Sequence, residues 1–98
     1  MSESKNTNTT TAVAVAPPKT KALKKWKVIV HNDDINTYNY VIKTFVEIVR
    51  LDEKTAYLKT VEVDKQGLSI VAITHKEHAE FIQGQLQSKA LTVTIEPD

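Results

Sequence analysis

The composition of this 98-residue chain changes abruptly near residue 23, and this break leaves residues 24–98 to build the fold. Residues 1–23 contain no aromatic residue and are rich in Ser, Thr, Asn and Ala, with a Pro17–Pro18 pair. Such a segment cannot bury enough apolar surface to offset the entropy lost on ordering. We therefore predict a flexible N-terminal extension over residues 1–23 and a single folded domain over residues 24–98.

Charge and cysteine content argue against several classes of protein. The 13 Lys and Arg residues nearly balance the 12 Asp and Glu residues, which disfavours a nucleic-acid-binding domain. Without cysteine the chain has no disulfide framework, no thiol nucleophile and no cysteine-ligated zinc. No apolar run approaches the roughly 18–20 residues of a membrane span. We expect a cytoplasmic protein that binds neither nucleic acid nor membranes.

Three short segments have the pattern of β-strands. They are rich in β-branched residues and span residues 26–31, 68–74 and 91–95. Asn32–Asp34 follows the first segment, and side chains of this type bond to nearby backbone and favour a turn. Gly67 precedes the second segment and suits the left-handed residue that ends a helix.

Apolar residues at three- and four-residue spacing predict three helices between these strands. The first is expected over Tyr38–Val49 behind a cap at Asn36 or Thr37, and the second from a cap at Asp52 to about Val63, with Ala56, Tyr57, Leu58 and Val61 as apolar members. The third is expected to follow a capping box at Thr74–Glu77 and to point Phe81, Ile82 and Leu86 inward. The order β-α-α-β-α-β predicts an α+β fold, a small three-stranded antiparallel sheet with three helices packed on one face.

Few residues offer catalytic or metal-binding chemistry. Two glycines are too few for a phosphate-binding loop, and no Ser or Thr has the spacing of a hydrolytic nucleophile. His75 and His78 lie three residues apart, but zinc needs three or four ligands, so we interpret both as exposed. His31, at a strand end, is interpreted as a surface or half-buried histidine. The lysines around Trp26 are interpreted as a solvated strand edge.

Asn32, Asp33 and Asp34 are the polar residues that stand out. The plainer interpretation is a turn that leads into the following helix. The alternative is a cation site in which these side chains, joined by Asp64 from another element, hold a metal ion or an ammonium group. An acidic metal-dependent enzyme built on Asp33, Asp34 and Asp64 is the enzymatic form of that alternative.

The segment Trp26–Asp34 resembles the opening strand and the K-V-x-L-x-N-D-D signature of the ClpS family of proteolytic adaptors. The similarity covers about residues 26–95 without a gap and includes Tyr38, Val63, Gln66–Gly67, Thr74 and Glu77. It implies an adaptor rather than an enzyme, with no cofactor and no metal. Such an adaptor recognises the N-terminal residue of a substrate, an N-degron, and delivers it to an AAA+ unfoldase of the ClpA or ClpC type, partnered with ClpP. The extension over residues 1–23 would then engage the unfoldase.

The resemblance also implies roles for individual residues. Asn32 and Asp33 would hold the α-ammonium of the degron together with Asp64, which stands where the family has a histidine. A carboxylate is a stronger partner than imidazole for an ammonium group. Glu77 corresponds to the surface that docks on the N-terminal domain of the unfoldase. The pocket for the degron side chain corresponds to Asn36, Tyr38, Val41, Thr60, Val61 and Val63.

From the resemblance we expect a monomeric adaptor for substrates that begin with Leu, Phe, Tyr or Trp. Tyr38 and Thr60 stand where the family commonly has methionine, and these changes must reshape the pocket. We expect bulky Tyr38 at the rim to exclude the β-branched residues Ile and Val. The alternative is a ClpS-fold regulator that binds the unfoldase and alters its substrate choice, but has lost degron binding.

Overall fold

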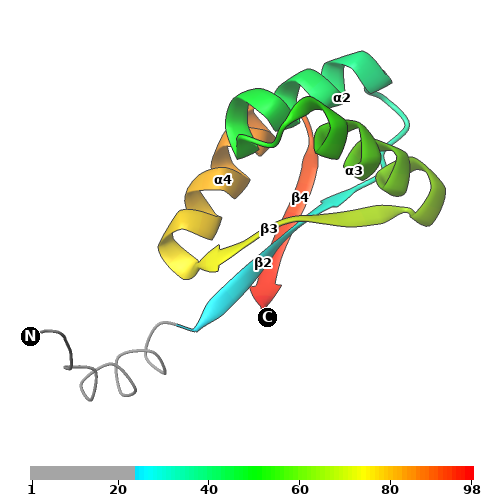
Figure 1. Ribbon diagram of the computed structural model, residues 1–98. Coiled ribbons are helices and arrows are strands. Elements are labelled where there is room, and N and C mark those ends of the chain that lie inside the picture. The colour runs from blue at the N-terminus through cyan, green and yellow to red at the C-terminus, as the bar shows by residue number, and fades with distance from the viewer. Residues whose placement is uncertain (1–23) are drawn as a thin grey trace, which may run out of the picture.

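The computed structural model describes residues 24–98, which form a three-stranded sheet with helices on one face (Figure 1). The strands are β2 (Lys25–His31), β3 (Leu68–His75) and β4 (Thr92–Pro97). β2 lies in the centre and pairs antiparallel with both neighbours. The α+β fold predicted from the sequence is therefore confirmed. The extension predicted over residues 1–23 lies outside the described residues.

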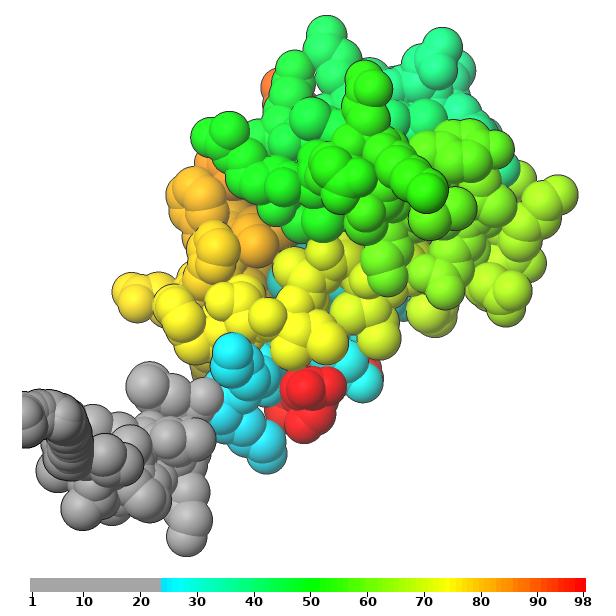
Figure 2. All heavy atoms as spheres, in the orientation of Figure 1, coloured from blue at the N-terminus to red at the C-terminus, as the bar shows by residue number. Residues whose placement is uncertain are grey.

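Four helical segments connect the strands. They are α2 (Tyr38–Thr44), the π-helical segment η2 (Phe45–Val49), α3 (Glu53–Gln66) and α4 (Lys76–Ser88). α4 contacts all three strands, α3 contacts β3, and α2 packs against α3. In the space-filling view, α3 and β3 face the viewer and β2 is mostly hidden behind β3 (Figure 2). Within the central strand, Val28, Ile29 and Val30 are buried.

The ends of the helices follow the local signals in the sequence. The Thr37 side chain accepts a hydrogen bond from the backbone N–H of Tyr40 and caps α2. Asp52 caps α3 by accepting from Thr55, and these hydrogen bonds from Thr55 hold the pKa of Asp52 below its ordinary value. Gly67 ends α3 with a φ of 90°, the left-handed conformation that favours glycine.

The first predicted helix differs from the structure in its second half. It is α-helical only to Thr44 and continues as the π-helical segment η2, which ends at Arg50 with a φ of 70°. Within Phe45–Val49 every residue except Glu47 is apolar, and all four apolar side chains lie in the core or pack against it.

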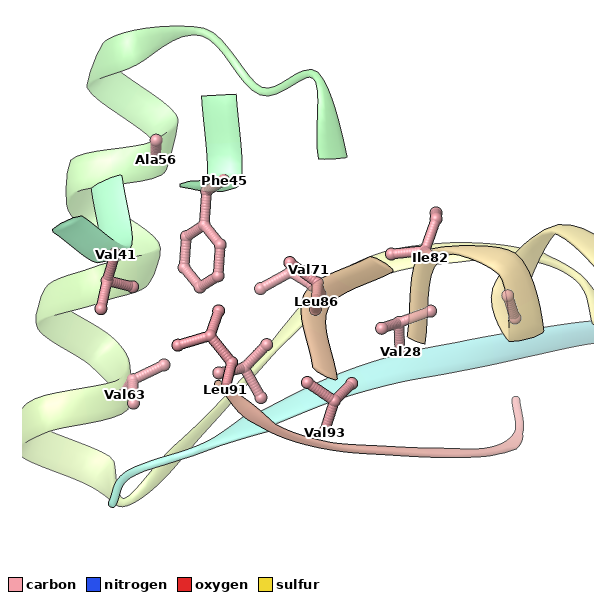
Figure 3. Close-up of a cluster of buried hydrophobic side chains, with 12 residues drawn as sticks. Val28, Val41, Phe45, Ala56, Val63, Val71, Ile82, Leu86, Leu91 and Val93 are labelled. Atoms are coloured by element: carbon pink, nitrogen blue, oxygen red, sulfur yellow. The ribbon is translucent and has the colours of Figure 1, made fainter. Parts of the chain in front are cut away.

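The hydrophobic core lies between the sheet and the helices. Phe45, Leu86, Val28 and Val30 are its largest fully buried apolar side chains. Figure 3 shows Phe45 pointing from η2 toward the sheet, with side chains of all the other elements around it. The core continues to the end of the sheet where β2 ends at His31 and β4 begins at Thr92.

Three expectations about the helices are wrong. The capping box does not form, because Thr74 pairs with Trp26 inside the sheet and His75 takes the cap position without a side-chain hydrogen bond. Phe81 was expected inside α4 but is 61% exposed, and Ala79 occupies the buried position beside Ile82. In α3, Tyr57 and Leu58 are exposed, whereas the buried residues are Ala56, Thr60 and Val63.

Candidate functional site

A cavity of about 180 Å³ opens where four segments of the chain meet. These segments are the end of β2 with its following turn, the start of α2, the second half of α3, and the residue before β4. The lining residues are Val30, His31, Asn32, Asp33, Asp34, Asn36, Tyr38, Val41, Thr60, Val63, Asp64 and Leu91.

The apolar floor of the cavity is the outer end of the core. Val30, Val41, Val63 and Leu91 line the cavity and belong to the buried core cluster. Figure 3 shows Val41, Val63 and Leu91 near one another at the end of the core. Thr60 extends this apolar surface, because its hydroxyl donates to the carbonyl of Ala56 at 2.8 Å and so is satisfied within α3. The floor is therefore preformed by packing.

Asn32 and Asp34 form the turn that the sequence predicts. The Asn32 amide donates to the Asp34 carboxylate at 3.0 Å, and the backbone N–H of Asp34 donates back to Asn32 at 3.3 Å. Asp34 adopts a φ of 58°, a left-handed conformation that Asp tolerates in such turns. The backbone N–H of Asn32 also donates to the carbonyl of Gly67 at 2.9 Å, which holds the turn against the end of α3.

Asp33 is fixed by donors from three places. Its carboxylate accepts from the backbone N–H of Ile35 at 3.1 Å, from the Asn36 amide at 3.5 Å and from the Thr92 hydroxyl at 3.4 Å. Asn36 donates in addition to the carbonyl of Ala90 at 3.2 Å. The carboxylate therefore has a defined position between the loop before α2 and the start of β4.

Asp64 lies in the last turn of α3 and lines the same cavity as the loop. Its carboxylate accepts a hydrogen bond of 2.5 Å from the hydroxyl of Tyr38, the first residue of α2. This bond is the main cause that raises the pKa of Tyr38 above its ordinary value of 10.0. Desolvation and the negative charge of Asp64 act in the same direction.

The charge of the lining favours a cationic ligand. It contains three carboxylates and neither Lys nor Arg, and His31, whose Nε2 lies 2.8 Å from the Thr94 hydroxyl, is its one basic side chain. Within residues 24–98, no three His, Asp or Glu side chains are grouped closely enough to hold a metal ion. Asp33, Asp34 and Asp64 thus share a cavity but lack the geometry that the metal-enzyme hypothesis needs. A single ammonium group between oxygen acceptors fits the arrangement better.

Eight of the nine residues assigned to the binding site line this one cavity, and Val61 does not. Val61 lies one position along α3 from Thr60, which turns it by about 100° away from the cavity. It instead lines an outer groove of α3 with Leu58 and Lys59. The residues that sequence reasoning left out of the binding set are Val30, His31, Asp34 and Leu91. His31 and Asp34 flank the Asn32–Asp33 pair, so adjacency to that pair was the available signal.

Glu77 lies apart from the cavity, in the first turn of α4. Around it is the α4 surface, which we define as Trp26, His75, Lys76, Glu77, His78 and Phe81. Lys76 lies 5.0 Å from the centre of the Trp26 ring, and the rings of His78 and Phe81 are stacked with their centres 6.4 Å apart. These side chains, four of them outer residues of one helix, form a surface that is rich in aromatic and imidazole rings.

Residues 21–94 match the family model described as ATP-dependent Clp protease adaptor protein ClpS. The chain belongs to the ClpS family. The Clp protease adapter ClpS of Synechococcus sp. strain CC9902 is 37% identical over 79 residues, which cover 80% of this chain and 76% of that protein. The ClpS of Prochlorococcus marinus strain MIT 9515 is 37% identical over 90 residues, which cover 87% and 86%. The protein is therefore an adaptor of the Clp protease.

A solved ClpS structure has the same fold. It is Agrobacterium tumefaciens ClpS2 bound to L-phenylalaninamide, which superimposes with a TM-score of 0.72 at 24% identity. The match covers 78% of this chain and 99% of the ClpS2 chain.

In residues 24–98 there is no helix that is both long enough and apolar enough to span a membrane.

Proposed function

We propose that the cavity binds the first residue of a protein substrate and that the chain delivers this substrate to a Clp unfoldase. The observation that carries the proposal is the combination of an acidic mouth with an apolar floor in one cavity. An N-terminal residue has a charged ammonium group one bond from the carbon that bears its side chain. An internal residue has no such charge. The cavity therefore matches the two features that distinguish a chain terminus.

In the proposed complex, the α-ammonium lies between the loop and α3. Asn32 offers its amide oxygen, and Asp33 and Asp64 offer carboxylate oxygens from two sides. Hydrogen bonds to charged groups contribute about 1.5–3 kcal/mol each, which is enough to discriminate a free amino group from a blocked one. Asp34 supports this arrangement through its hydrogen bonds to Asn32.

The substrate side chain would occupy the apolar floor. A buried apolar cavity of about 150 Å³ holds benzene, so a cavity of about 180 Å³ has room for a Leu or Phe side chain. Tyr and Trp remain in the predicted set, and the indole of Trp is the tightest fit. The ligand in the ClpS2 structure supports the same class, because L-phenylalaninamide has a free α-amino group and an aromatic side chain.

Delivery requires a second surface. We propose that the chain acts as a monomer and docks through the α4 surface, with Glu77, on the N-terminal domain of a ClpA- or ClpC-type unfoldase. Residues 1–23 would then engage the unfoldase as a flexible extension. Separate surfaces for the two partners allow one small domain to hold both at once.

The test is a binding titration with two fluorescent peptides that differ only at the terminal amine. One begins with a free Phe, and the other carries an N-acetyl group on the same residue. We expect the free peptide to bind and the acetylated peptide to bind at least tenfold more weakly, because acetylation removes the charge. Failure of peptides with free Leu, Phe, Tyr and Trp termini to bind, with retained binding to the unfoldase domain, would favour the regulator that lacks degron recognition.

A further inference from the structure

The hydrogen bond between Tyr38 and Asp64 joins two helices across the mouth of the cavity. Tyr38 is the first residue of α2, and Asp64 lies in the last turn of α3, 26 residues later in the chain. Both side chains line the cavity and both are exposed at its rim. At 2.5 Å, the bond is in the range of strong hydrogen bonds from a hydroxyl to a carboxylate.

Two carboxylates that line the cavity, those of Asp33 and Asp64, are held in different ways. Asp33 accepts from a backbone N–H, an amide and a hydroxyl, so several donors define its position. Within residues 24–98, the hydrogen bond from Tyr38 is the only one found for the Asp64 side chain. An exposed carboxylate without it would sample several rotamers. The orientation of Asp64 therefore depends on one phenol.

This bond leaves Asp64 able to bind a cation. A carboxylate has about four acceptor positions on its two oxygens, and Tyr38 uses one of them at Oδ2. The second oxygen remains available on the rim of the cavity. The phenol also keeps its proton wherever the ligand is charged, since a free α-amino group titrates near pH 7.7–8.0 and the pKa of Tyr38 is raised above 10.0.

We propose that Tyr38 is a positioning residue, whose hydroxyl holds the Asp64 carboxylate toward the cavity so that its second oxygen receives the ligand ammonium opposite Asp33. This inference rests on the proposed binding of an N-terminal residue and adds a residue that determines the affinity for its charge. In this arrangement Tyr38 acts twice. Its ring forms part of the rim, and its hydroxyl sets the geometry of the ammonium site through Asp64.

The experiment separates the hydroxyl from the ring. Tyr38→Phe removes only the hydroxyl, and Tyr40→Phe is the matched control, because Tyr40 lies on the same helix, is also 39% exposed and donates its own hydrogen bond to the carbonyl of Lys89. We expect Tyr38→Phe to weaken binding of the free Phe-initiated peptide roughly five- to tenfold. Binding of the N-acetylated peptide should not change, and Tyr40→Phe should leave both affinities unchanged.

A double-mutant cycle tests whether the hydroxyl acts through Asp64. Asp64→Asn removes the charge, and Tyr38→Phe added to it should cause little further loss if the two residues act as a unit. Equal losses from Tyr38→Phe in the presence and absence of the Asp64 charge would overturn the inference. The inference would also be overturned if Tyr38→Phe bound the free peptide as tightly as the original protein or more tightly. The hydroxyl would then make no contribution to binding or would compete with the ligand.

Failure of the proposed function gives a different result. If the unaltered protein does not distinguish the free peptide from the acetylated one, the ammonium site itself is wrong and the inference falls with it. If the unaltered protein distinguishes them and Tyr38→Phe does so equally well, only the inference falls. Thermal unfolding of each variant shows whether a lost affinity comes from a lost fold.

Discussion

The two ends of strand β2 lead to surfaces of opposite character. Its C-terminal end runs into the acidic cavity, where Asn32 and Asp33 follow directly on His31. Its N-terminal end brings Trp26 next to Lys76 at the start of α4. The polar groups of the cavity are joined by a network of hydrogen bonds, whereas the α4 surface consists of rings and charged side chains in contact with one another. A strand of seven residues separates them by roughly 20 Å.

If the cavity and the α4 surface bind the two proposed partners, this difference explains how one small domain could hold both without competition. The cavity needs several segments in fixed positions, because its acceptors come from the loop after β2 and from α3, and donors in β4 and α2 hold them. The α4 surface needs little more than one helix. Changes in the cavity should therefore alter ligand binding sharply, and changes on the α4 surface should leave the fold and the cavity intact.

The largest expected difference lies within α4, between a residue that faces the core and its exposed neighbour. Ile82 is 4% exposed, whereas Phe81 is 61% exposed. Ile82→Ala should lower the free energy of unfolding by about 2–5 kcal/mol, and Phe81→Ala by less than about 0.5 kcal/mol. Denaturant unfolding measures both values. A loss of more than about 2 kcal/mol in Phe81→Ala would place Phe81 in the core and break the division between the two faces of the helix.

The next prediction compares one substitution in the cavity with one substitution on the α4 surface. Asp33→Ala removes a carboxylate from the proposed ammonium site and should weaken binding of a Phe-initiated peptide roughly tenfold to a hundredfold. Glu77→Lys should leave this affinity unchanged and weaken binding to the isolated N-terminal domain of the unfoldase. Calorimetric titration of each variant with each partner gives the four affinities. A loss of peptide binding in Glu77→Lys would show that the two surfaces are coupled.

The third prediction concerns specificity for the side chain of the first substrate residue and tests the role of Tyr38 at the cavity mouth. Tyr38 stands at the rim, so a side chain that branches at Cβ should meet its ring, whereas Leu should pass it and reach the floor. We expect Ile- and Val-initiated peptides to bind more weakly than a Leu-initiated peptide by about 1–3 kcal/mol, from steric exclusion and lost contacts. Competition binding with peptides that differ only in this residue measures the order. Equal affinities for Ile and Leu would exclude a selective role of Tyr38 at the rim.

Local sequence signals predict most of this fold. The first cap was expected at Asn36 or Thr37, and the structure places it at Thr37. The cap at Asp52 and the left-handed Gly67 are confirmed, and all three features depend on a few neighbouring residues. Apart from the capping box at Thr74–Glu77 and the π-helical segment η2, the errors concern which way a helical side chain points. Phe81 and Val61 are each next to a position that does face inward, and one step along a helix turns a side chain by about 100°. Hydrophobicity alone did not separate such neighbours.

The candidate site could be predicted only in part, because it is made of contacts between distant segments. The resemblance to the ClpS family located Asn32, Asp33 and Asp64 in sequence. It could not show that Leu91 closes the floor, since nothing near Leu91 in the sequence marks it. Nor could it show that the side chains of Tyr38 and Asp64 are bonded to each other. Only the packing of α2 against α3 brings that pair together.

The smallest expected effect concerns the stability of the same pair at alkaline pH. The hydrogen bond to Asp64 raises the pKa of Tyr38 in the folded protein, so its contribution to stability is complete below the unfolded value of about 10 and is lost as pH rises through the higher folded value. Above that value a phenolate would face the Asp64 carboxylate. The Tm of the unaltered protein should therefore exceed that of Asp64→Asn slightly at pH 8, and this difference should shrink or reverse toward pH 11.

The control repeats this comparison without the phenol hydroxyl. The difference in Tm between the Tyr38→Phe variant and the Tyr38→Phe/Asp64→Asn double variant should not shrink or reverse between pH 8 and pH 11. Because both side chains are exposed, water and salt screen the interaction and the shift in Tm should be small. A difference that stays constant from pH 8 to 11 would contradict the bond between Tyr38 and Asp64 in solution.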